Sequence, residues 1–305
     1  MRLRAHAKIN LNLAVLGARP DGYHELRTTF QSLALHDTLE FEGGMGGWSV
    51  ACDVPGIPLD ESNLVSKAAR LVWEAAGRSG EPAGRARIAK RIPAQAGLGG
   101  GSADGAAALV GWNRVWDAAL PAATLAALAA RLGADVPFFL CAGTAVGRGR
   151  GDRIDPLPDE EARAVVLVMP RFGVPTPQAF GWWDEDHAGT AVSQPPGRDG
   201  ARGPAGRSGA AVVGIFNDLE PPVLGRHPEL GEVRALLLAA GAREAAMTGS
   251  GSTMFGLFDA DDRAGHAADA LRDPRWQVVL TRTATREEAG FGGQLATGGR
   301  QAVTR

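Results

Sequence analysis

A chain of 305 residues is long enough to form one large domain or two smaller ones, each with its own buried core. Its net charge of −2 without a dense basic patch argues against a nucleic-acid-binding surface, and no apolar run approaches the length of a membrane span. Two cysteines, Cys52 and Cys141, are too few for a disulfide framework, and an N-terminus without a signal-peptide core predicts a cytoplasmic protein.

Strand and helix patterns alternate through the first part of the chain. Residues 4–15 alternate apolar and polar side chains, which predicts a strand with Lys8 and Asn10 on the same face. The Pro-Asp-Gly of "GARPDGYHEL" predicts a turn after this strand. The elements predicted next are strands at 28–35 and 38–41, a helix at 63–76 and a strand at 86–92.

The segment "PAQAGLGGGSADGAAAL" at 93–109 places five glycines between residues 97 and 105 and continues into a predicted alanine-rich helix at 103–116. Free N–H groups at the start of such a helix favour a phosphate ligand. The segment is not a P-loop, because no lysine follows its glycines. It does not match the dinucleotide fingerprint either, because Ser102 stands where a third glycine or alanine is needed. The alternative interpretation is a flexible linker.

A predicted helix at 125–132 ends at Gly133, and the glycine spacing of residues 143–157 predicts tight turns between short strands. From about residue 156 a second unit begins. Its predicted elements are a strand at 163–170, helices at 176–183, 217–224 and 229–240, and strands on both sides of "TGSGST" at 248–253.

Two segments lack the pattern of a packed element. Residues 188–211 are rich in glycine, proline, serine and arginine, which predicts a disordered insertion. Residues 286–305 predict a flexible tail. The remaining alternation of strands and helices predicts a two-domain α+β enzyme, with domains at 1–155 and 156–285.

Four stretches carry candidate functional residues, and each also has a structural explanation. In "AKINLNL", Lys8 and Asn10 would either line the floor of a cleft or lie on a solvated face of the strand. The glycine segment is either a phosphate loop or a linker. "GADVPFF" holds Asp135 between a glycine and a proline, as a common helix-terminal turn also would. "TGSGST" is consistent with an ordinary hairpin loop. Only three of the 32 lysines and arginines are lysines, so the lysine at position 8 favours the interpretation that this position needs a compact ammonium group.

In this order the four stretches resemble the GHMP kinases, the small-molecule kinases named for galactokinase, homoserine kinase, mevalonate kinase and phosphomevalonate kinase. The family motif Pro-x3-Gly-Leu-Gly-small-small-Ser-Ala matches residues 93–103. The resemblance extends to the branch that phosphorylates 4-(cytidine 5′-diphospho)-2-C-methyl-D-erythritol in the non-mevalonate isoprenoid route. It covers about residues 3–285 without the insertion, through "AKINLNLAVLGARPDGYHEL", "GLGGGSAD", "LGADVPFFL", "VPTPQAF", "FNDLE" and "TGSGST".

The resemblance implies a two-domain GHMP kinase fold. Its N-terminal domain is of the ribosomal-protein-S5 type and binds ATP, and its C-terminal domain is a ferredoxin-like α/β sandwich. It implies ATP as co-substrate, Mg²⁺ bound with the nucleotide, and transfer of phosphate to give a 2-phosphate. No dedicated metal-binding residues, no nucleic-acid partner and no membrane are expected, and the chain is expected to be a monomer or weak homodimer.

The resemblance also assigns the reaction and the nucleotide to particular residues. Asp135 would be the general base for the acceptor hydroxyl, and Lys8 would stabilise negative charge on that hydroxyl and on the γ-phosphate. The loop would wrap the β-phosphate of ATP, with glycines because a Cβ would block so close an approach. The implied nucleotide-binding residues are Pro93, Ala94, Gly97, Leu98, Gly99, Gly100, Gly101, Ser102 and Ala103, with Asn63 as a candidate adenine contact.

The same resemblance implies a pocket for the cytidylyl substrate. Tyr23 and Phe180 would stack on the two faces of cytosine, and His24 would read the edge of the base. Asn10 and Thr176 would hold the methylerythritol and diphosphate groups. The structural alternative is a Tyr–Phe pair in the core.

Three positions depart from the family pattern: His6 replaces a usual proline, Ala103 a common serine and Asp152 a usual glutamate. The change at Ala103 leaves Ser102 to supply the hydroxyl near the phosphates. Two other functions compete with this prediction. A homoserine- or mevalonate-type kinase would lack the Tyr23–His24 pair and the aromatic residue after "PTP". An inactive ligand-binding regulator would lack Lys8 or Asp135, and both residues are present.

Overall fold

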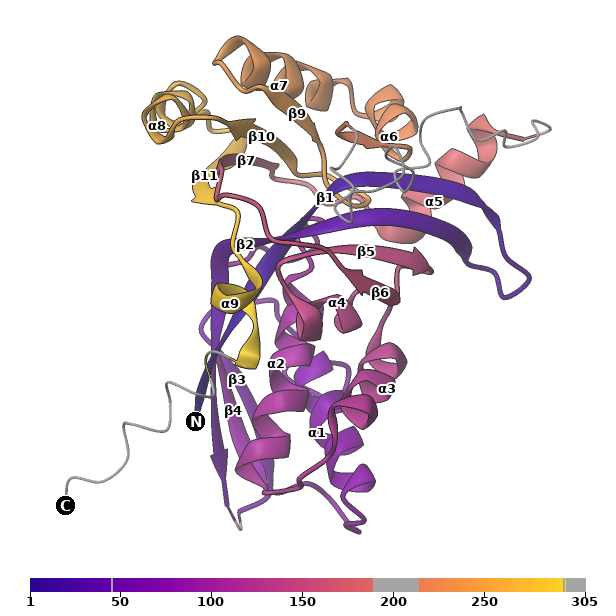
Figure 1. The fold of residues 1–305 in the computed structure, drawn as a ribbon, viewed down its shortest axis with the longest axis vertical. Helices are drawn as coiled ribbons and strands as arrows, with labels where there is room; N and C mark the ends of the chain where they lie inside the picture. The colour runs from indigo at the N-terminus through magenta and orange to yellow at the C-terminus, as the bar shows by residue number, and fades with distance from the viewer. Residues whose placement is uncertain (45, 189–213, 293, 295–305) are drawn as a thin grey trace.

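A computed structural model describes residues 1–44, 46–188, 214–292 and 294 (Figure 1). The predicted insertion at 188–211 lies outside these residues except for Ala188, and so does most of the predicted tail. The tail prediction is wrong for its first residues, since Arg286–Ala289 form helix α9. Thr285 caps this helix in a reciprocal capping box with Glu288, and the backbone N–H of Arg286 donates to the Asp159 carboxylate at 2.7 Å.

A long antiparallel hairpin, β1 (Arg2–Ala18) and β2 (His24–Gly43), is the centre of a seven-stranded sheet. The prediction of two separate strands at 28–35 and 38–41 is therefore wrong, because β2 runs through both without a break. The main path of the sheet is β3-β4-β2-β1-β8, and β5 pairs with β2 and β6. The other strands are β3 (Trp48–Cys52), β4 (Gly84–Ala89), β5 (Thr144–Gly149), β6 (Arg153–Pro156) and β8 (Phe216–Asn217).

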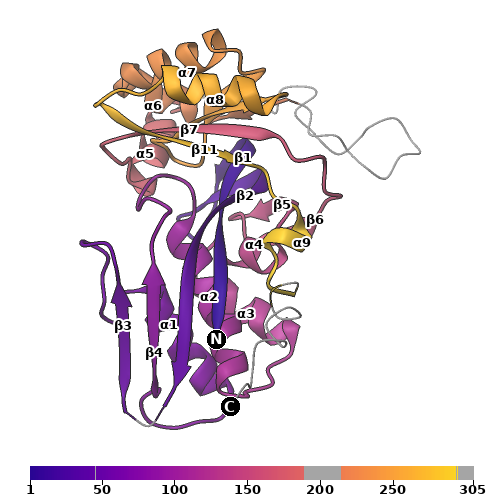
Figure 2. The same cartoon turned by 90° about the vertical axis from the view of Figure 1, so that its left-hand side faces the viewer.

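Four helices cover one face of this sheet (Figure 2). They are α1 (Leu64–Ala75), α2 (Gly100–Val115), α3 (Ala122–Leu132) and α4 (Val136–Cys141). The central helix α2 starts three residues before its predicted start, inside the glycine segment. Small residues let it pack closely, since a Cβ at Gly111 would lie 2.6 Å from the Phe41 ring. This packing holds α2 close against the sheet.

The second unit is a four-stranded antiparallel sheet of order β11-β7-β10-β9, with helices over its outer face (Figure 2). Val166 and Val168 of β7 pack towards those helices, and Val165 and Leu167 pack towards β1. Both faces of β7 are buried, which explains the unbroken apolar run "AVVLVM". The elements are β7 (Ala164–Pro170), α5 (Thr176–Asp186), α6 (Glu220–Arg226), α7 (Pro228–Ala239), β9 (Glu244–Met247), β10 (Met254–Phe258), α8 (Asp261–Ala270) and β11 (Trp276–Arg282).

The hairpin β1–β2 contributes to both cores. Leu3 and Ala5 lie in the core under α2, whereas Leu13 and Val15 lie in the core of the second unit. Strand β8 returns from the second half of the chain and pairs in parallel with Asn12 and Leu13. The middle of β1, which carries Lys8 and Asn10, therefore lies where the two units meet. The domain boundary near residue 155 stays a prediction.

His6 makes the stability of the folded protein depend on pH. The side chain is buried, its Nδ1 lies 2.8 Å from the carbonyl oxygen of Leu33, and its Nε2 has no hydrogen-bond partner. Burial lowers the pKa of His6 from 6.5 to about 4. Between these two values the unfolded chain binds a proton that the folded protein does not, so the free energy of unfolding falls as the pH falls. The loss reaches about 3 kcal/mol near pH 4.

We expect His6→Asn to weaken this pH dependence, because Asn can still donate a hydrogen bond to Leu33 but does not titrate. Thermal melting followed from about pH 7 to pH 4.5 should show a smaller decrease in Tm for the variant than for the unaltered protein. Two parallel pH profiles would mean that other groups cause the acid sensitivity.

Candidate active site between the two units

A cleft of about 790 Å³ lies where β1 and β2 meet the glycine segment, Asp135 and α5. It brings together stretches that are far apart in the sequence. Lys8, Asp135 and every predicted substrate residue line it. Its lining includes Lys8, Asn10, Tyr23, His24, Thr28, Pro93, Ala94, Gly97, Gly99, Gly100, Gly101, Ser102, Asp135, Arg150, Thr176, Phe180, Asp184, Gly249 and Ser250.

Lys8 and Asp135 form an ion pair in the middle of the cleft. The Nζ atom of Lys8 lies 3.6 Å from Oδ2 of Asp135, and the side chains are 4% and 37% exposed. The lysine is therefore enclosed by protein, whereas the carboxylate still faces solvent. Burial lowers the pKa of Lys8, and the negative charge of Asp135 opposes that shift. An exposed carboxylate beside a buried ammonium can take a proton while the cation stabilises nearby negative charge.

Asn10 fixes the position of Lys8. The Lys8 ammonium donates to Oδ1 of Asn10 at 2.6 Å, and the Asn10 amide donates to the Thr28 hydroxyl at 2.7 Å. The backbone N–H of Asn10 donates to the hydroxyl of Thr248, from "TGSGST", at 3.0 Å. Asn10 is buried, so its amide serves these internal contacts. The stretch at 248–253 thus reaches the lysine through Asn10.

The glycines of the phosphate-loop candidate are required by the protein itself. Gly97 and Gly99 have φ of 73° and 70°, in the left-handed region that other residues rarely adopt. A Cβ at Gly97 would lie 2.4 Å from the carbonyl oxygen of Thr248, and one at Gly99 would lie 2.6 Å from Phe139. A Cβ at Gly101 would have no atom of another segment within 4 Å. At Gly97 and Gly99 the need for glycine thus comes from backbone conformation and packing, not only from the approach of a phosphate.

The start of α2 opens into the cleft. Its first N-terminal hydrogen bond runs from the N–H of Ala103 to the carbonyl of Gly99. The backbone N–H groups of residues 100–102 precede that bond, and these residues line the cleft. They form a positive helix end suited to an anion.

Three of the predicted nucleotide residues do not line this cleft. Leu98 and Ala103 are buried beneath the loop, where the carbonyl of Leu98 accepts a hydrogen bond from the N–H of Lys8. Asn63 caps α1 by accepting a hydrogen bond from the N–H of Val65 at 2.9 Å. Its amide nitrogen donates to Pro58, so both ends of its side chain are engaged. The neighbouring Leu64 lines the cleft in its place.

The other end of the cleft is aromatic. The His24 ring stacks on Phe180 with centroids 4.7 Å apart, and His24 Nε2 lies 2.8 Å from the Asp184 carboxylate. Tyr23 is 53% exposed, with the Arg150 guanidinium 5.0 Å from its ring centre. In this structure the ring stacked on Phe180 is thus that of His24. Next to it, the hydroxyls of Thr176 and Ser250 lie 3.0 Å apart.

Thr28, Arg150 and Asp184 are among the residues of this cleft that sequence reasoning missed. Thr28 lies on β2 opposite β1, and a polar residue inside a predicted strand gave no signal of its own. Asp184 lies two turns after the predicted "PTP" landmark on α5, on the face that carries Phe180. The helical spacing of Phe180 and Asp184 could have indicated it.

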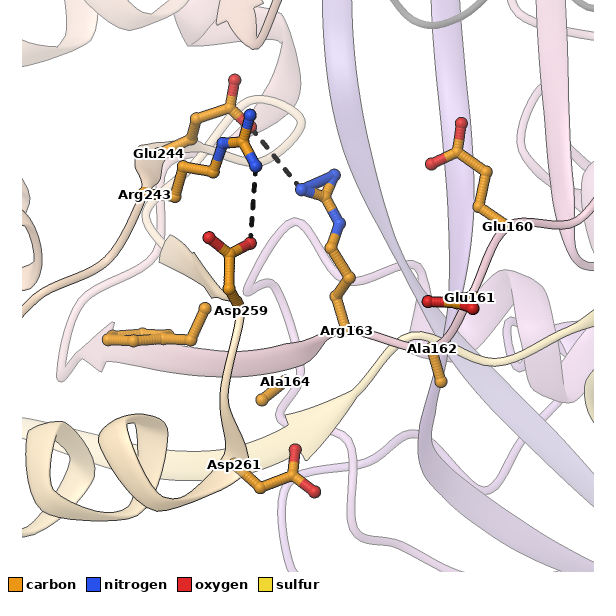
Figure 3. Close-up of a pocket in the computed structure, with 10 residues that line it drawn as sticks. Glu160, Glu161, Ala162, Arg163, Ala164, Arg243, Glu244, Asp259 and Asp261 are labelled. Carbon is orange, nitrogen blue, oxygen red and sulfur yellow. Dashed lines mark ion pairs between the residues drawn. The ribbon is translucent and has the colours of Figure 1, made fainter.

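A second cavity, of about 450 Å³, lies in the second unit (Figure 3). Two ion pairs lie in it, Arg163 with Glu244 at 3.9 Å and Arg243 with Asp259 at 3.6 Å, and three further carboxylates, of Glu160, Glu161 and Asp261, make its lining acidic. In the described part of the chain, no three His, Cys, Asp or Glu side chains are grouped so that they could hold a metal ion. The helices described here are all too short or too polar to cross a membrane.

Comparison with known proteins agrees with the fold. Residues 63–143 match the model of the GHMP kinases N-terminal domain, and residues 205–274 match that of the GHMP kinases C-terminal domain. The 4-diphosphocytidyl-2-C-methyl-D-erythritol kinase of Pelotomaculum thermopropionicum is 44% identical over 282 residues, covering 92% of this chain and 96% of the relative. That of Moorella thermoacetica is 39% identical over 289 residues, covering 93% and 99%.

Solved structures show the same relationship. A crystal structure of a 4-(cytidine 5′-diphospho)-2C-methyl-D-erythritol kinase superposes with a TM-score of 0.75 at 37% identity, covering 93% of this chain and 99% of the other. A homoserine kinase from Cytophaga hutchinsonii superposes with a TM-score of 0.64 at 17% identity, covering 93% and 95%, which shows the shared fold alone. The predicted two-domain α+β fold is confirmed, and the chain belongs to the 4-diphosphocytidyl-2-C-methyl-D-erythritol kinase family of the GHMP kinases.

Proposed function

We propose that this protein transfers the γ-phosphate of ATP to the 2-hydroxyl of 4-(cytidine 5′-diphospho)-2-C-methyl-D-erythritol, a step of the non-mevalonate isoprenoid pathway. The observation that carries the proposal is the Lys8–Asp135 pair, at 3.6 Å, in a cleft with a helix N-terminus and an aromatic end. The helix end suits a nucleotide phosphate and the aromatic end suits a base. The reacting pair lies in a cleft that can hold both.

In this mechanism Asp135 accepts the proton of the attacking hydroxyl, and the oxygen attacks the γ-phosphorus as the bond to ADP breaks. Lys8 stabilises the negative charge on the attacking oxygen and on the transferred group. The phosphates of ATP would add negative charge beside Lys8, and this favours its ammonium form against the effect of burial. The hydrogen bond from Lys8 to Asn10 keeps the ammonium aimed at the cleft.

The nucleotide would bind with its phosphates at the N–H groups of residues 100–102. Mg²⁺ prefers oxygen ligands and usually keeps several waters, so it needs no all-protein cage. The hydroxyl of Ser102, which lines the cleft, and the phosphates themselves would hold it. Bound there, the metal would neutralise charge on the phosphates during transfer.

The cytidylyl group would bind at the aromatic end. Tyr23 offers an exposed stacking face, whereas the His24 ring already covers one face of Phe180 and has Asp184 as its hydrogen-bond partner. Because a carboxylate only accepts hydrogen bonds, Asp184 holds the proton of neutral His24 on Nε2 and leaves Nδ1 as an acceptor. An acceptor at the base edge suits the amino group of cytosine.

The experiment that tests this function is to incubate the protein with Mg-ATP and a panel of alcohols, and to measure ADP release. The panel contains 2-C-methyl-D-erythritol with and without its cytidine diphosphate group, homoserine and mevalonate. Release of ADP only with the cytidylyl compound is the expected result. Turnover of homoserine or mevalonate would identify a different GHMP kinase activity, and ligand binding without turnover would identify a regulator.

We expect Tyr23→Ala to raise the KM for the cytidylyl substrate roughly tenfold or more, because a stacking contact contributes about 1–3 kcal/mol. The KM for ATP should stay within about twofold, since the nucleotide binds at the opposite end. Tyr23 is half exposed, so the fold should not be weakened. Steady-state kinetics with each substrate varied in turn measures both constants. Equal increases in both would show that Tyr23 has a structural role instead.

A further inference from the structure

Lys90, the second buried lysine of the chain, lies under the phosphate loop and not in the cleft. Its Nζ atom lies 2.5 Å from Oδ2 of Asp37 and 2.7 Å from Oδ2 of Asp104. All three side chains are at least nine-tenths buried. A single ammonium thus joins two carboxylates inside the protein.

The two carboxylates hold opposite ends of the loop. Asp37, on β2, accepts hydrogen bonds through Oδ1 from the backbone N–H groups of Arg91 and Ile92, at 2.5 and 2.8 Å. These residues lead directly into the loop at Pro93. Asp104 lies on α2, the helix that leaves the loop. Lys90 therefore connects the segment entering the loop with the helix that follows it.

The ammonium also lies directly beneath the first residue of that helix. A Cβ at Gly100 would lie 3.0 Å from Nζ of Lys90 and 2.9 Å from Cγ2 of Ile92. No larger group fits between the start of α2 and the lysine. A guanidinium is broader than an ammonium, which gives a physical reason for lysine here in a chain that otherwise uses arginine.

Stability alone does not explain this arrangement. Burying three charged groups costs free energy, and apolar residues of similar size often stabilise a core as well or better. The cost is visible at Asp104, where burial raises the pKa to about 7, and its Oδ1 has no hydrogen-bond partner. What the three side chains supply is a fixed geometry at both ends of one loop.

We propose that Lys90, Asp37 and Asp104 position the phosphate loop, so that the N–H groups of residues 100–102 stay at the spacing that nucleotide phosphates require. The proposal rests on the nucleotide-binding role given to this loop by the proposed function. None of the three residues lines the cleft, so they are positioning residues rather than catalytic ones. Their loss should affect the binding of ATP far more than that of the alcohol substrate.

The decisive variant removes the whole charge cluster. Lys90→Met alone leaves two buried carboxylates unpaired and is expected to lower Tm strongly. The triple variant Lys90→Met, Asp37→Asn, Asp104→Asn keeps similar side-chain shapes, and the amide oxygen introduced at position 37 can still accept from the N–H groups of Arg91 and Ile92. We expect most of the lost Tm to return, while the Kd for ATP measured by calorimetry stays roughly tenfold or more above that of the unaltered protein.

Two further variants complete the test. Lys90→Arg keeps the charge but not the compact shape, and it should also raise the Kd for ATP several-fold. Val233→Ala, a cavity in the distant core under α7, lowers Tm without touching the loop and should leave the Kd unchanged. The KM for the cytidylyl substrate should stay within about twofold in all of them. ATP affinity that recovers with Tm in the triple variant, or that is normal in Lys90→Arg, would overturn the proposal. Failure of the unaltered protein to bind ATP would instead count against the proposed function.

Discussion

Asp135→Asn is expected to lower turnover by roughly two orders of magnitude or more, while ATP still binds. Asparagine keeps the size of the side chain and can accept a hydrogen bond, but it cannot take the proton of the attacking hydroxyl. The carboxylate is more than a third exposed and makes no helix-capping hydrogen bond, so the fold should tolerate the change. Single-turnover measurements of phosphate transfer, with calorimetry for ATP binding, test this expectation.

The pH profile of Asp135→Asn separates two causes of the loss. The substitution also removes the negative charge that supports the ammonium form of Lys8, whose pKa burial already lowers. If an uncharged Lys8 caused the loss, lowering the pH would restore the ammonium and the turnover. If the missing base causes it, turnover stays low at every pH. Asp262→Asn, an exposed aspartate in the first turn of α8, is the matched control and should be without effect. Normal turnover in Asp135→Asn would remove Asp135 from the mechanism.

Lys8→Arg is expected to abolish most phosphoryl transfer, although it keeps the positive charge. The ammonium lies 2.6 Å from Asn10, and the backbone surrounds it closely: a Cβ at Gly249 would lie 3.4 Å from Nζ. A Cβ at Gly99 would lie 3.2 Å from Cγ of the same side chain. A guanidinium cannot occupy this space without displacing the loop or Asn10. Turnover should fall by roughly two orders of magnitude or more, the scale of losing one preorganised electrostatic contact.

The chain itself offers a control for this substitution. Lys67 lies exposed on α1, away from the cleft, so Lys67→Arg should leave turnover and Tm unchanged. In Lys8→Arg we expect the Kd for ATP to stay within a few-fold of normal, because the N–H groups of residues 100–102 still bind the phosphates. Turnover like that of the unaltered protein would show that position 8 needs only a positive charge.

Helices and strands were predicted correctly from the sequence where the local pattern was strong. The amphipathic pattern of residues 63–76 predicted α1, which Asn63 caps, and alternation in residues 4–15 predicted β1. The division of β2 into two strands failed because Asp37, a polar residue at the division, is buried and accepts hydrogen bonds from the backbone N–H groups of Arg91 and Ile92. The prediction that the tail is flexible from residue 286 failed for a similar reason, since the backbone N–H of Arg286 donates to Asp159, which is far away in the sequence. Composition carries no information about such partners.

For the candidate site, the motifs predicted the residues, and the fold shows which other residues they contact. Lys8, Asp135, Ser102 and the aromatic residues were all predicted from the sequence, because the resemblance rests on motifs that contain them. The roles of Thr248 and Lys90 were not predicted, since Thr248 meets Asn10 and Lys90 meets Asp37 only after folding. The predicted nucleotide contact of Asn63 stays a prediction, whereas the structure uses its side chain as a helix cap.

The sequence by itself determined what acts over a few residues: a glycine-rich loop, the helix that follows it, and the lysine and aspartate in their motifs. These features depend on the backbone freedom and charge of each residue type and on the pattern of its neighbours in the sequence, so they can be predicted locally. Only the tertiary structure decided the distances. The burial of both faces of β7 places the second unit against β1, and this packing brings "TGSGST" and α5 to Lys8. The ion pair at 3.6 Å between β1 and the start of α4 depends on a different long-range contact, the packing of α4 into the core of the first unit, which no local pattern encodes either.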